Sequence, residues 1–275
     1  MVSKRDYSTE AVEAARSVLI ELVHMLGEYR NHMVLIGGWV PQLLLPQSGT
    51  PHVGSLDVDI ALNHRTMTEE GYRTIRQALI ERGYVEGKQP FVFIRRVRKG
   101  DSDIDIEVDF LAGEYEGTGR SRRHQKVQDI RARKARGCDL AFEMTAEVVV
   151  RGQLPEGGRD SVSIRVASIV PFLVMKGMAL VDRLKEKDAY DIYYSVANFP
   201  GGLDALAEEL QPHIQHGLVH EGLGKIASKF SSENDMGPKF VADFEEIDDP
   251  DDRALRQRDA YERIHYVLKK LDFAE

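Results

Sequence analysis

Cysteine, long apolar runs and repeated segments are scarce or missing in this sequence, and each absence narrows the classes of protein to consider. A single cysteine, Cys138, excludes an internal disulfide and any metal cluster held by several thiolates, and it fits a reducing cytoplasm. No run of about 18 apolar residues is present, so we expect no transmembrane helix. The polar residues after Met1 do not resemble a signal peptide. We therefore expect a cytoplasmic protein that is not embedded in a membrane.

The net charge of −8 argues against a protein that coats DNA, but this charge is unevenly distributed. Between Arg120 and Arg136 there are eight basic residues and one acid, Asp129. Basic charge at this density is able to face the phosphates of a nucleic acid. The alternative is a helix whose solvated basic face pairs with acids elsewhere in the chain.

Hydrophobic periodicity predicts an α+β protein, with a mixed sheet flanked by helices and a helical C-terminal domain. Strands are expected at 33–36, 55–62, 91–97, 103–111, 148–151 and 162–166. Helices are expected at 9–27, from about residue 40, and from a cap at Thr68 to Gly83. After Ser168, helical spacing covers 169–197, 203–213, 219–230 and 252–272. The predicted domains are residues 1–165, with the sheet, and residues 166–275, made of helices.

Two aspartates one residue apart are the first candidate site. Asp57 and Asp59 alternate with Val58 and Ile60, the period of a strand, so both carboxylates point to one face. Their spacing along the strand is roughly 6.6 Å. Oxygen ligands at such a spacing suit Mg²⁺. The alternative for an isolated Asp-x-Asp is a solvated sheet edge.

A glycine pair lies about twenty residues upstream of the two aspartates. Gly37 and Gly38 follow the short apolar strand at 33–36 and precede a helix. At such a junction, backbone N–H groups can approach phosphate oxygens without a Cβ in the way, and the helix dipole favours an anion. Ser55, just before the aspartates, either hydrogen-bonds a triphosphate or simply begins the strand.

A third carboxylate is expected from the strand at 103–111, where acids and apolar residues alternate. Four acids on one face of a strand repel each other, which is a poor arrangement for solubility alone. We select Asp109, in Val-Asp-Phe-Leu, as the residue that completes a site with Asp57 and Asp59, with Glu107 as the alternative. Three carboxylates that hold two Mg²⁺ ions would suit phosphoryl or nucleotidyl transfer.

A basic stripe is the second informative feature. On a single helix, Lys176, Arg183 and Lys187 fall within roughly 40° of one another, with Asp191 at the margin. Such a stripe would bind a triphosphate and stabilise the departing pyrophosphate. The alternative is a salt-bridged surface helix, in which Asp188 and its neighbours pair with the lysines.

Taken together, these segments resemble the polymerase-beta-like nucleotidyltransferase superfamily. The resemblance rests on Gly-Gly-Trp at 37–39, Ser-Leu-Asp-Val-Asp at 55–59, Asp109, and Lys-Asp-x-Tyr-Asp at 187–191. It is closest to the AbiEii-type nucleotidyltransferases, toxins of type IV toxin–antitoxin and phage-defence systems. It implies a nucleotidyltransferase sheet, a nucleoside triphosphate (NTP) substrate, Mg²⁺ or Mn²⁺, an RNA acceptor such as the 3′ end of tRNA, and an antitoxin partner.

The resemblance also implies roles for individual residues. Asp57, Asp59 and Asp109 would bind the metal ions. Lys176 would contact the nucleotide, while Asp188 or Asp191 would act in the site or hold the neighbouring basic residues in place. Gly37, Gly38, Ser55, Arg183 and Lys187 complete the expected nucleotide site.

Two other functions stay open. The superfamily commonly has Gly-Ser where this chain has Gly37-Gly38, and Gly-Gly-Trp also occurs in enzymes that modify aminoglycosides or lincosamides. A relative that has lost catalysis and only binds nucleic acid is the third possibility. His52 and His64 flank the Asp-x-Asp strand and are close enough in sequence to reach a phosphate, but we expect them in surface loops.

Overall fold

The chain forms two units in the computed structural model, which describes residues 3–46, 49–67, 74–100, 102–113, 124–127 and 129–274. The sheet unit comprises Tyr7–Val40 and Gly54–Ser168, and the helical unit comprises Met1–Asp6, Pro41–Val53 and Ile169–Glu275. The α+β class is thus observed, with a mixed sheet and flanking helices. The predicted division at 165/166 lies close to 168/169, but residues 41–53 group with the helices instead of the sheet.

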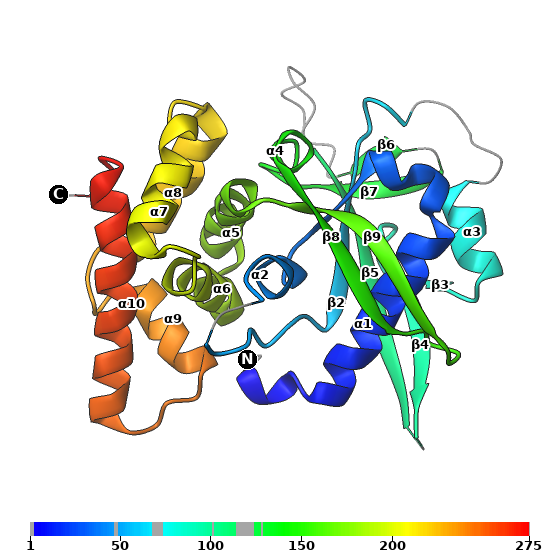
Figure 1. Cartoon of the computed structure of the whole chain (residues 1–275), viewed down its shortest axis with the longest axis horizontal. Coiled ribbons are helices and arrows are strands. Elements are labelled where there is room, and N and C mark those ends of the chain that lie inside the picture. Colours follow the sequence, from blue (N-terminus) through cyan, green and yellow to red (C-terminus); the bar gives the residue numbers. More distant parts are fainter. Residues whose placement is uncertain are drawn as a thin grey trace. The chain divides into compact units, whose positions relative to one another are not determined.

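The sheet unit is built on one mixed sheet, and its order places strands that are distant in sequence side by side (Figure 1). The path is β3-β4-β5-β2-β1-β9-β8, with β7 joined to β5 and β6 joined to β7. The strands are β1 Met33–Ile36, β2 Asp57–Leu62, β3 Val85–Glu86, β4 Val92–Lys99, β5 Ser102–Ala112, β6 His124–Val127, β7 Ile130–Lys134, β8 Thr145–Gln153 and β9 Arg159–Ala167. In the middle of the sheet, β2 runs parallel to β5 and antiparallel to β1.

One face of this sheet is covered by helix α1, Thr9–Met25, which begins at the predicted Ser8 cap (Figure 1). The apolar members of the central strands, such as Val58 and Val108, are fully buried. On the same face, Arg95 of β4 donates to Glu21 of α1, with a distance of 2.7 Å from Nε to Oε1. Because side chains alternate along a strand, Asp57, Asp59 and Asp109 point to the opposite face.

The shorter helices of the sheet unit include α3, Ile75–Glu81, and α4, Leu140–Glu143. Thr74 caps α3 in a capping box with Gln77, and the predicted cap at Thr68 lies outside the described residues. The predicted stop at Gly83 is confirmed, since this residue has φ +91° just after the helix.

The helical unit contains α5 Ile169–Arg183, α6 Glu186–Ala197, α7 Gly202–Leu210, α8 Gly217–Lys229, α9 Met236–Phe244 and α10 Pro250–Lys270. Helix α2, Trp39–Leu44, includes the border between the units. Helices α5 and α8 pack so closely at Gly177 that a Cβ there would lie 2.3 Å from the carbonyl oxygen of Gly222. The predicted helix at 169–197 is wrong in one respect: the chain turns at Leu184, where φ is +49°. Helix α9 was not predicted.

The segment considered as a basic helix is a β-hairpin instead. His124–Val127 and Ile130–Lys134 pair as antiparallel strands β6 and β7, while Arg120, Arg122 and Arg123 lie outside the described residues. In β7, buried Ile130 and Ala132 alternate with Arg131 and Arg133, which are exposed and half-buried. This is the period of a strand and not of a helix.

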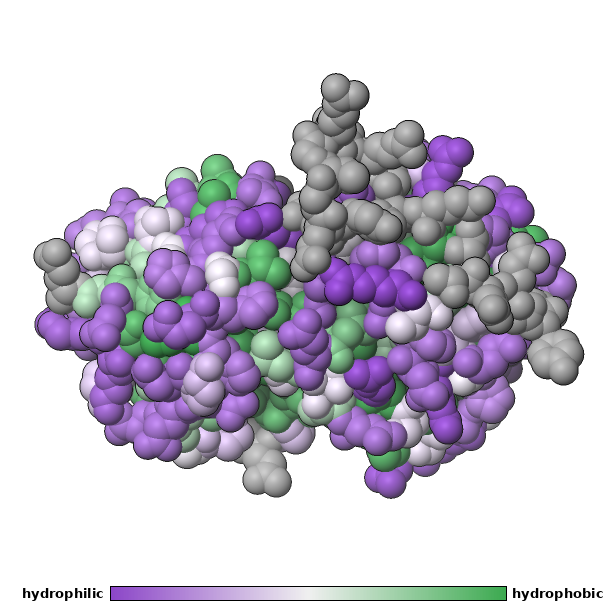
Figure 2. Space-filling view, turned by 90° about the horizontal axis from the view of Figure 1, so that it is seen from above, coloured by the Kyte–Doolittle hydropathy of each residue, from purple (hydrophilic) through white to green (hydrophobic). Residues whose placement is uncertain are grey.

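On the face shown in Figure 2, hydrophilic side chains predominate and hydrophobic ones form small groups. None of the helices described is both long enough and apolar enough to cross a bilayer.

Candidate active site

Three carboxylates come together on the face of the sheet that α1 leaves uncovered. In the parallel pairing of β2 with β5, Asp59 is opposite Asp109 and Asp57 is opposite Glu107. Neighbouring strands lie about 4.8 Å apart, and registered residues share a face. Asp57, Asp59 and Asp109 are half-buried, whereas Glu107 is exposed. The arrangement therefore brings together the three aspartates that the sequence selected, with Glu107 beside them.

The glycine pair lies directly against this acidic group. Gly37 has φ +74°, and a Cβ there would be 2.0 Å from Oδ2 of Asp59. A Cβ on Gly38 would be 2.6 Å from Oγ of Ser55. Glycine is required most clearly at position 37, where the positive φ and the contact with Asp59 both oppose a side chain, whereas a side chain at position 38 would first have to displace the Ser55 hydroxyl.

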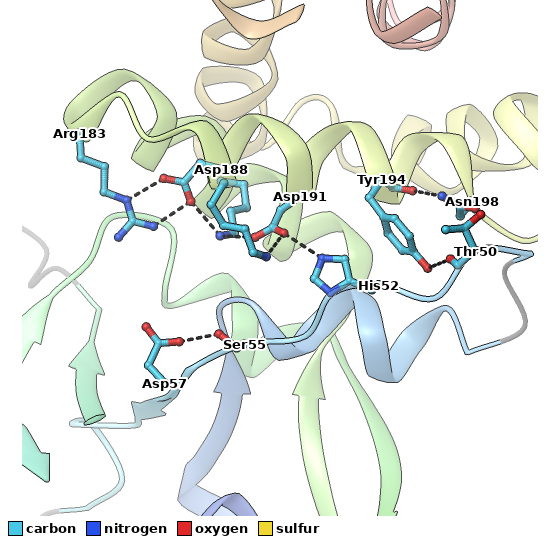
Figure 3. A network of polar contacts seen from close by, with 11 residues as sticks. Thr50, His52, Ser55, Asp57, Arg183, Asp188, Asp191, Tyr194 and Asn198 are labelled. Carbon is cyan, nitrogen blue, oxygen red and sulfur yellow. Dashed lines mark hydrogen bonds and ion pairs between the residues drawn. The ribbon is translucent and has the colours of Figure 1, made fainter. Parts of the chain in front are cut away.

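Two further contacts fix the first aspartate. The hydroxyl of Ser55 donates to Oδ1 of Asp57 over 2.5 Å (Figure 3). The indole Nε1 of Trp39 donates to the main-chain oxygen of Asp57 over 2.7 Å, and this tryptophan is fully buried. Trp39 therefore fixes the backbone of the site, a role that was not predicted from the sequence. Its position directly after the glycine pair is the sequence feature that could have indicated this role.

The donor atoms fit a hard divalent cation in their chemistry. Carboxylate oxygens are the ligands that Mg²⁺ and Mn²⁺ prefer, and the missing Cβ of Gly37 lets the Asp59 carboxylate lie against the glycine turn. Within the described part of the chain, no three His, Cys, Asp or Glu side chains are already arranged as a metal-binding group. A metal ion held by these three residues would therefore require their side chains to rearrange.

A second group of charges lies within the helical unit, and we call it the ion-pair cluster (Figure 3). Its members are His52, Lys176, Arg183, Lys187, Asp188 and Asp191. Lys176 Nζ lies 2.8 Å from Oδ1 of Asp188 and 2.7 Å from Oδ2 of Asp191. Arg183 donates from Nε and Nη2 to the two oxygens of Asp188, at 2.7 and 2.8 Å. Lys187 also pairs with Asp191.

This geometry corrects the picture of a basic stripe on one helix. Lys176 and Arg183 belong to α5, whereas Lys187 belongs to α6 beyond the turn at Leu184. The lysine side chains are 8 and 11% exposed, so they are not an open phosphate-binding surface. Asp191 lies between the two lysines and not at their margin. The arrangement is compatible with the expected role of Asp188 and Asp191 in holding the basic residues.

In the ion-pair cluster, burial and the partner charges shift the pKa of each paired group in opposite directions. Burial alone would raise the pKa of Asp191, but Lys176 and Lys187 outweigh it and hold that pKa far below its usual range. Burial would likewise lower the pKa of Lys176, but Asp188 and Asp191 raise it. Burial lowers the pKa of His52 to about 4, and Lys187 adds to this effect. At neutral pH, His52 is therefore uncharged and both aspartates are ionised.

His52 is not a surface residue, as we had expected from the sequence, but a buried partner of Asp191. Its Nε2 lies 2.9 Å from Oδ1 of Asp191, and its ring stacks on Tyr190 at 5.6 Å between centroids. Nearby, the hydroxyl of Tyr194 donates to the main-chain oxygen of Thr50 over 2.8 Å. His52 and Asp191 are 139 residues apart, so no local sequence signal could have joined them. His64, by contrast, is half-buried in the sheet unit.

Acid should weaken the protein through His52. Because its pKa is about 4 in the folded state and near 6.5 when unfolded, the unfolded chain binds the proton more readily between these values. The His52 contribution is fully present above pH 6.5 and falls as pH drops to 4, by roughly 3 kcal/mol. We expect urea unfolding to show that the stability difference between wild type and His52→Gln shrinks by this amount. Parallel pH profiles for the two proteins would contradict it.

Comparison of the chain with protein-family models gives no match, and comparisons with curated proteins and with solved structures give none either. A functional assignment therefore depends on the chemistry of the residues themselves.

Proposed function

We propose that the protein is a metal-dependent nucleotidyltransferase, which moves a nucleoside monophosphate from an NTP to an acceptor hydroxyl. The observation that carries the proposal is the register of β2 and β5, which sets Asp109 opposite Asp59 on the face shared with Asp57. The close approach of Gly37 to Asp59 supports it, because the backbone of the glycine turn then lies beside the acidic group. A solvated sheet edge would not require glycine at this position.

Each residue has a role in this chemistry. The acceptor oxygen bonds to the α-phosphorus, the bond to pyrophosphate breaks, and Asp109 accepts the hydroxyl proton. Gly37 and Gly38 present N–H groups to the phosphates, and Ser55 orients Asp57. Asp57, Asp59 and Asp109 would hold Mg²⁺ or Mn²⁺, which neutralises phosphate charge and lowers the pKa of a bound hydroxyl.

For the acceptor we propose RNA, with the 3′ end of tRNA as the first choice. The resemblance to AbiEii-type toxins favours it, and it also implies a cytoplasmic protein with an antitoxin partner. The basic composition of residues 120–136 supports an RNA acceptor as well. Within the helical unit, the same resemblance assigns Lys176 to nucleotide contact, but its burial and its pairing with Asp188 and Asp191 favour a role in holding that unit together.

The test is transfer of label from an NTP. With Mg²⁺, each of four α-labelled NTPs in turn and total tRNA, we expect label in the RNA from at least one nucleotide. Chelation of the metal should abolish the signal, and addition of Mn²⁺ should restore it. If no nucleotide labels the RNA under any of these conditions, the RNA acceptor is wrong.

A small-molecule acceptor is the second candidate, and Gly38 is the observation that favours it. Gly-Gly in place of Gly-Ser is shared with antibiotic-modifying nucleotidyltransferases, and a Cβ at position 38 would lie 2.6 Å from Oγ of Ser55, so a serine there would have to displace that hydroxyl. Replacing tRNA by an aminoglycoside or a lincosamide in the same assay separates the two acceptors. If the protein binds RNA but labels neither class of acceptor, it is a relative without catalysis.

A further inference from the structure

Arg133 lies on the same face of the sheet as the three aspartates. Strand β7 runs parallel to β5, with Arg133 opposite Leu111, and Asp109 lies two residues before Leu111 on β5. Residues two apart on a strand share a face, as do registered residues of neighbouring parallel strands. The positive charge of Arg133 is therefore one strand away from Asp109, on the face of the proposed active site.

The contacts of Arg133 differ from those of the arginines on β4. Arg95 is paired with Glu21, and Arg96 forms two hydrogen bonds with Asp105. The guanidinium carbon of Arg133 lies 5.6 Å from the centroid of the Phe91 ring, which supports the side chain from one side. Its Nε is buried and has no hydrogen-bond partner among the described residues.

The geometry points to Arg133 as a phosphate-binding residue, whose ligand is the triphosphate of the nucleotide. This inference rests on the proposed function. A face with three carboxylates repels a polyanion, so a cation on that face is needed beside any divalent ion. The planar guanidinium presents a fork of N–H donors that matches two phosphate oxygens, and its stacking on Phe91 leaves that fork available.

Binding of inorganic tripolyphosphate in the presence of Mg²⁺ tests this assignment, because this probe carries the phosphates without a base. Calorimetry on Arg133→Gln should show a dissociation constant about 10- to 100-fold above wild type. Arg133→Lys should lie between the two, since it keeps the charge but loses the fork. Arg131 is the matched control: it shares the strand and the face but is exposed, so Arg131→Gln should change binding less than about fivefold.

The protein carries its own reporter of where the probe binds. Trp39 is the only tryptophan, and its indole is bonded to the main chain of Asp57, so its fluorescence should change with tripolyphosphate in wild type. Equal affinities for wild type and a folded Arg133→Gln would overturn the role of Arg133. A drop of equal size in Arg131→Gln would overturn it too, because the effect would then be general electrostatics.

Failure of the role of Arg133 can be distinguished from failure of the proposed function. If wild type transfers label to an acceptor while Arg133→Gln binds tripolyphosphate normally, the enzyme assignment stands and the role of Arg133 falls. If wild type neither transfers label nor binds tripolyphosphate, both are wrong. Circular dichroism checks the fold of each variant, and the lysine variant gives the answer if the glutamine variant does not fold.

Discussion

Replacement of Asp59 by Asn is expected to lower the rate of nucleotidyl transfer by about 1,000-fold or more. Metal ions supply several kcal/mol of transition-state stabilisation, and each 1.4 kcal/mol corresponds to about tenfold in rate. Asp59 stands between Asp109 across the strands and the backbone of Gly37, so its charge is central to the acidic group. The amide keeps the shape of the side chain but is a poor ligand for a hard cation. Initial rates of label transfer, at saturating Mg²⁺, measure the effect.

Asp105→Asn is the control for this experiment. Asp105 is on β5 and on the same face as Asp109, but it is exposed and paired with Arg96. We expect its loss to change the transfer rate less than about twofold, since an exposed ion pair contributes little. The free energy of unfolding of Asp59→Asn should stay within about 1 kcal/mol of wild type, because repulsion among neighbouring carboxylates is relieved. Full activity in Asp59→Asn would remove the basis of the enzyme proposal.

Replacement of Asp191 by Ala is expected to destabilise the protein by about 3 to 5 kcal/mol, the largest effect on stability that we predict. The substitution leaves Lys176 and Lys187 without one of their carboxylates, in a place where neither is well solvated. Removal of one partner of a buried ion pair costs more than the pair itself contributes, because the remaining charge stays desolvated. Urea denaturation at neutral pH, followed by circular dichroism, gives the difference in free energy of unfolding.

Asp243→Ala offers a matched comparison, since its partner is also a basic residue on another helix. Asp243 accepts from Arg253 over 2.5 Å, but about a third of each side chain is exposed. Its loss should therefore cost less than about 1 kcal/mol. If the two variants were equally stable, the ion-pair cluster would not hold the helical unit together in the way its burial indicates.

Alternation of side chains was enough to predict the strands that carry the site. In β2 and β5 the acids occur at every second residue, and the apolar residues between them are buried against α1. The helix start at Ser8 was likewise correct, because a cap acts on its own first turn and needs no distant partner. The selection of Asp109 over Glu107 matches the difference in burial between these residues.

Properties that depend on distant contacts were not accessible from the sequence. The register between β2 and β5, which sets Asp59 opposite Asp109, joins residues 50 apart, and the contact of His52 with Asp191 joins residues still further apart. The hairpin at 124–134 was considered as a helix because its many basic residues hid a short alternation of Ile130 and Ala132. The end of α5 was missed because Leu184 has a left-handed conformation, which an apolar side chain rarely adopts.

The helical unit is discontinuous in the sequence, and this has a consequence for biosynthesis. Residues 41–53 emerge from the ribosome more than a hundred residues before α6, yet His52 packs against Asp191, Tyr190 and Tyr194 of that helix. Until then, this early segment lacks its packing partners and is open to chaperones and proteases. A nascent chain stopped after Ser168 would finish the sheet but keep that segment exposed. Completion of the C-terminal helices would therefore be the step that protects it.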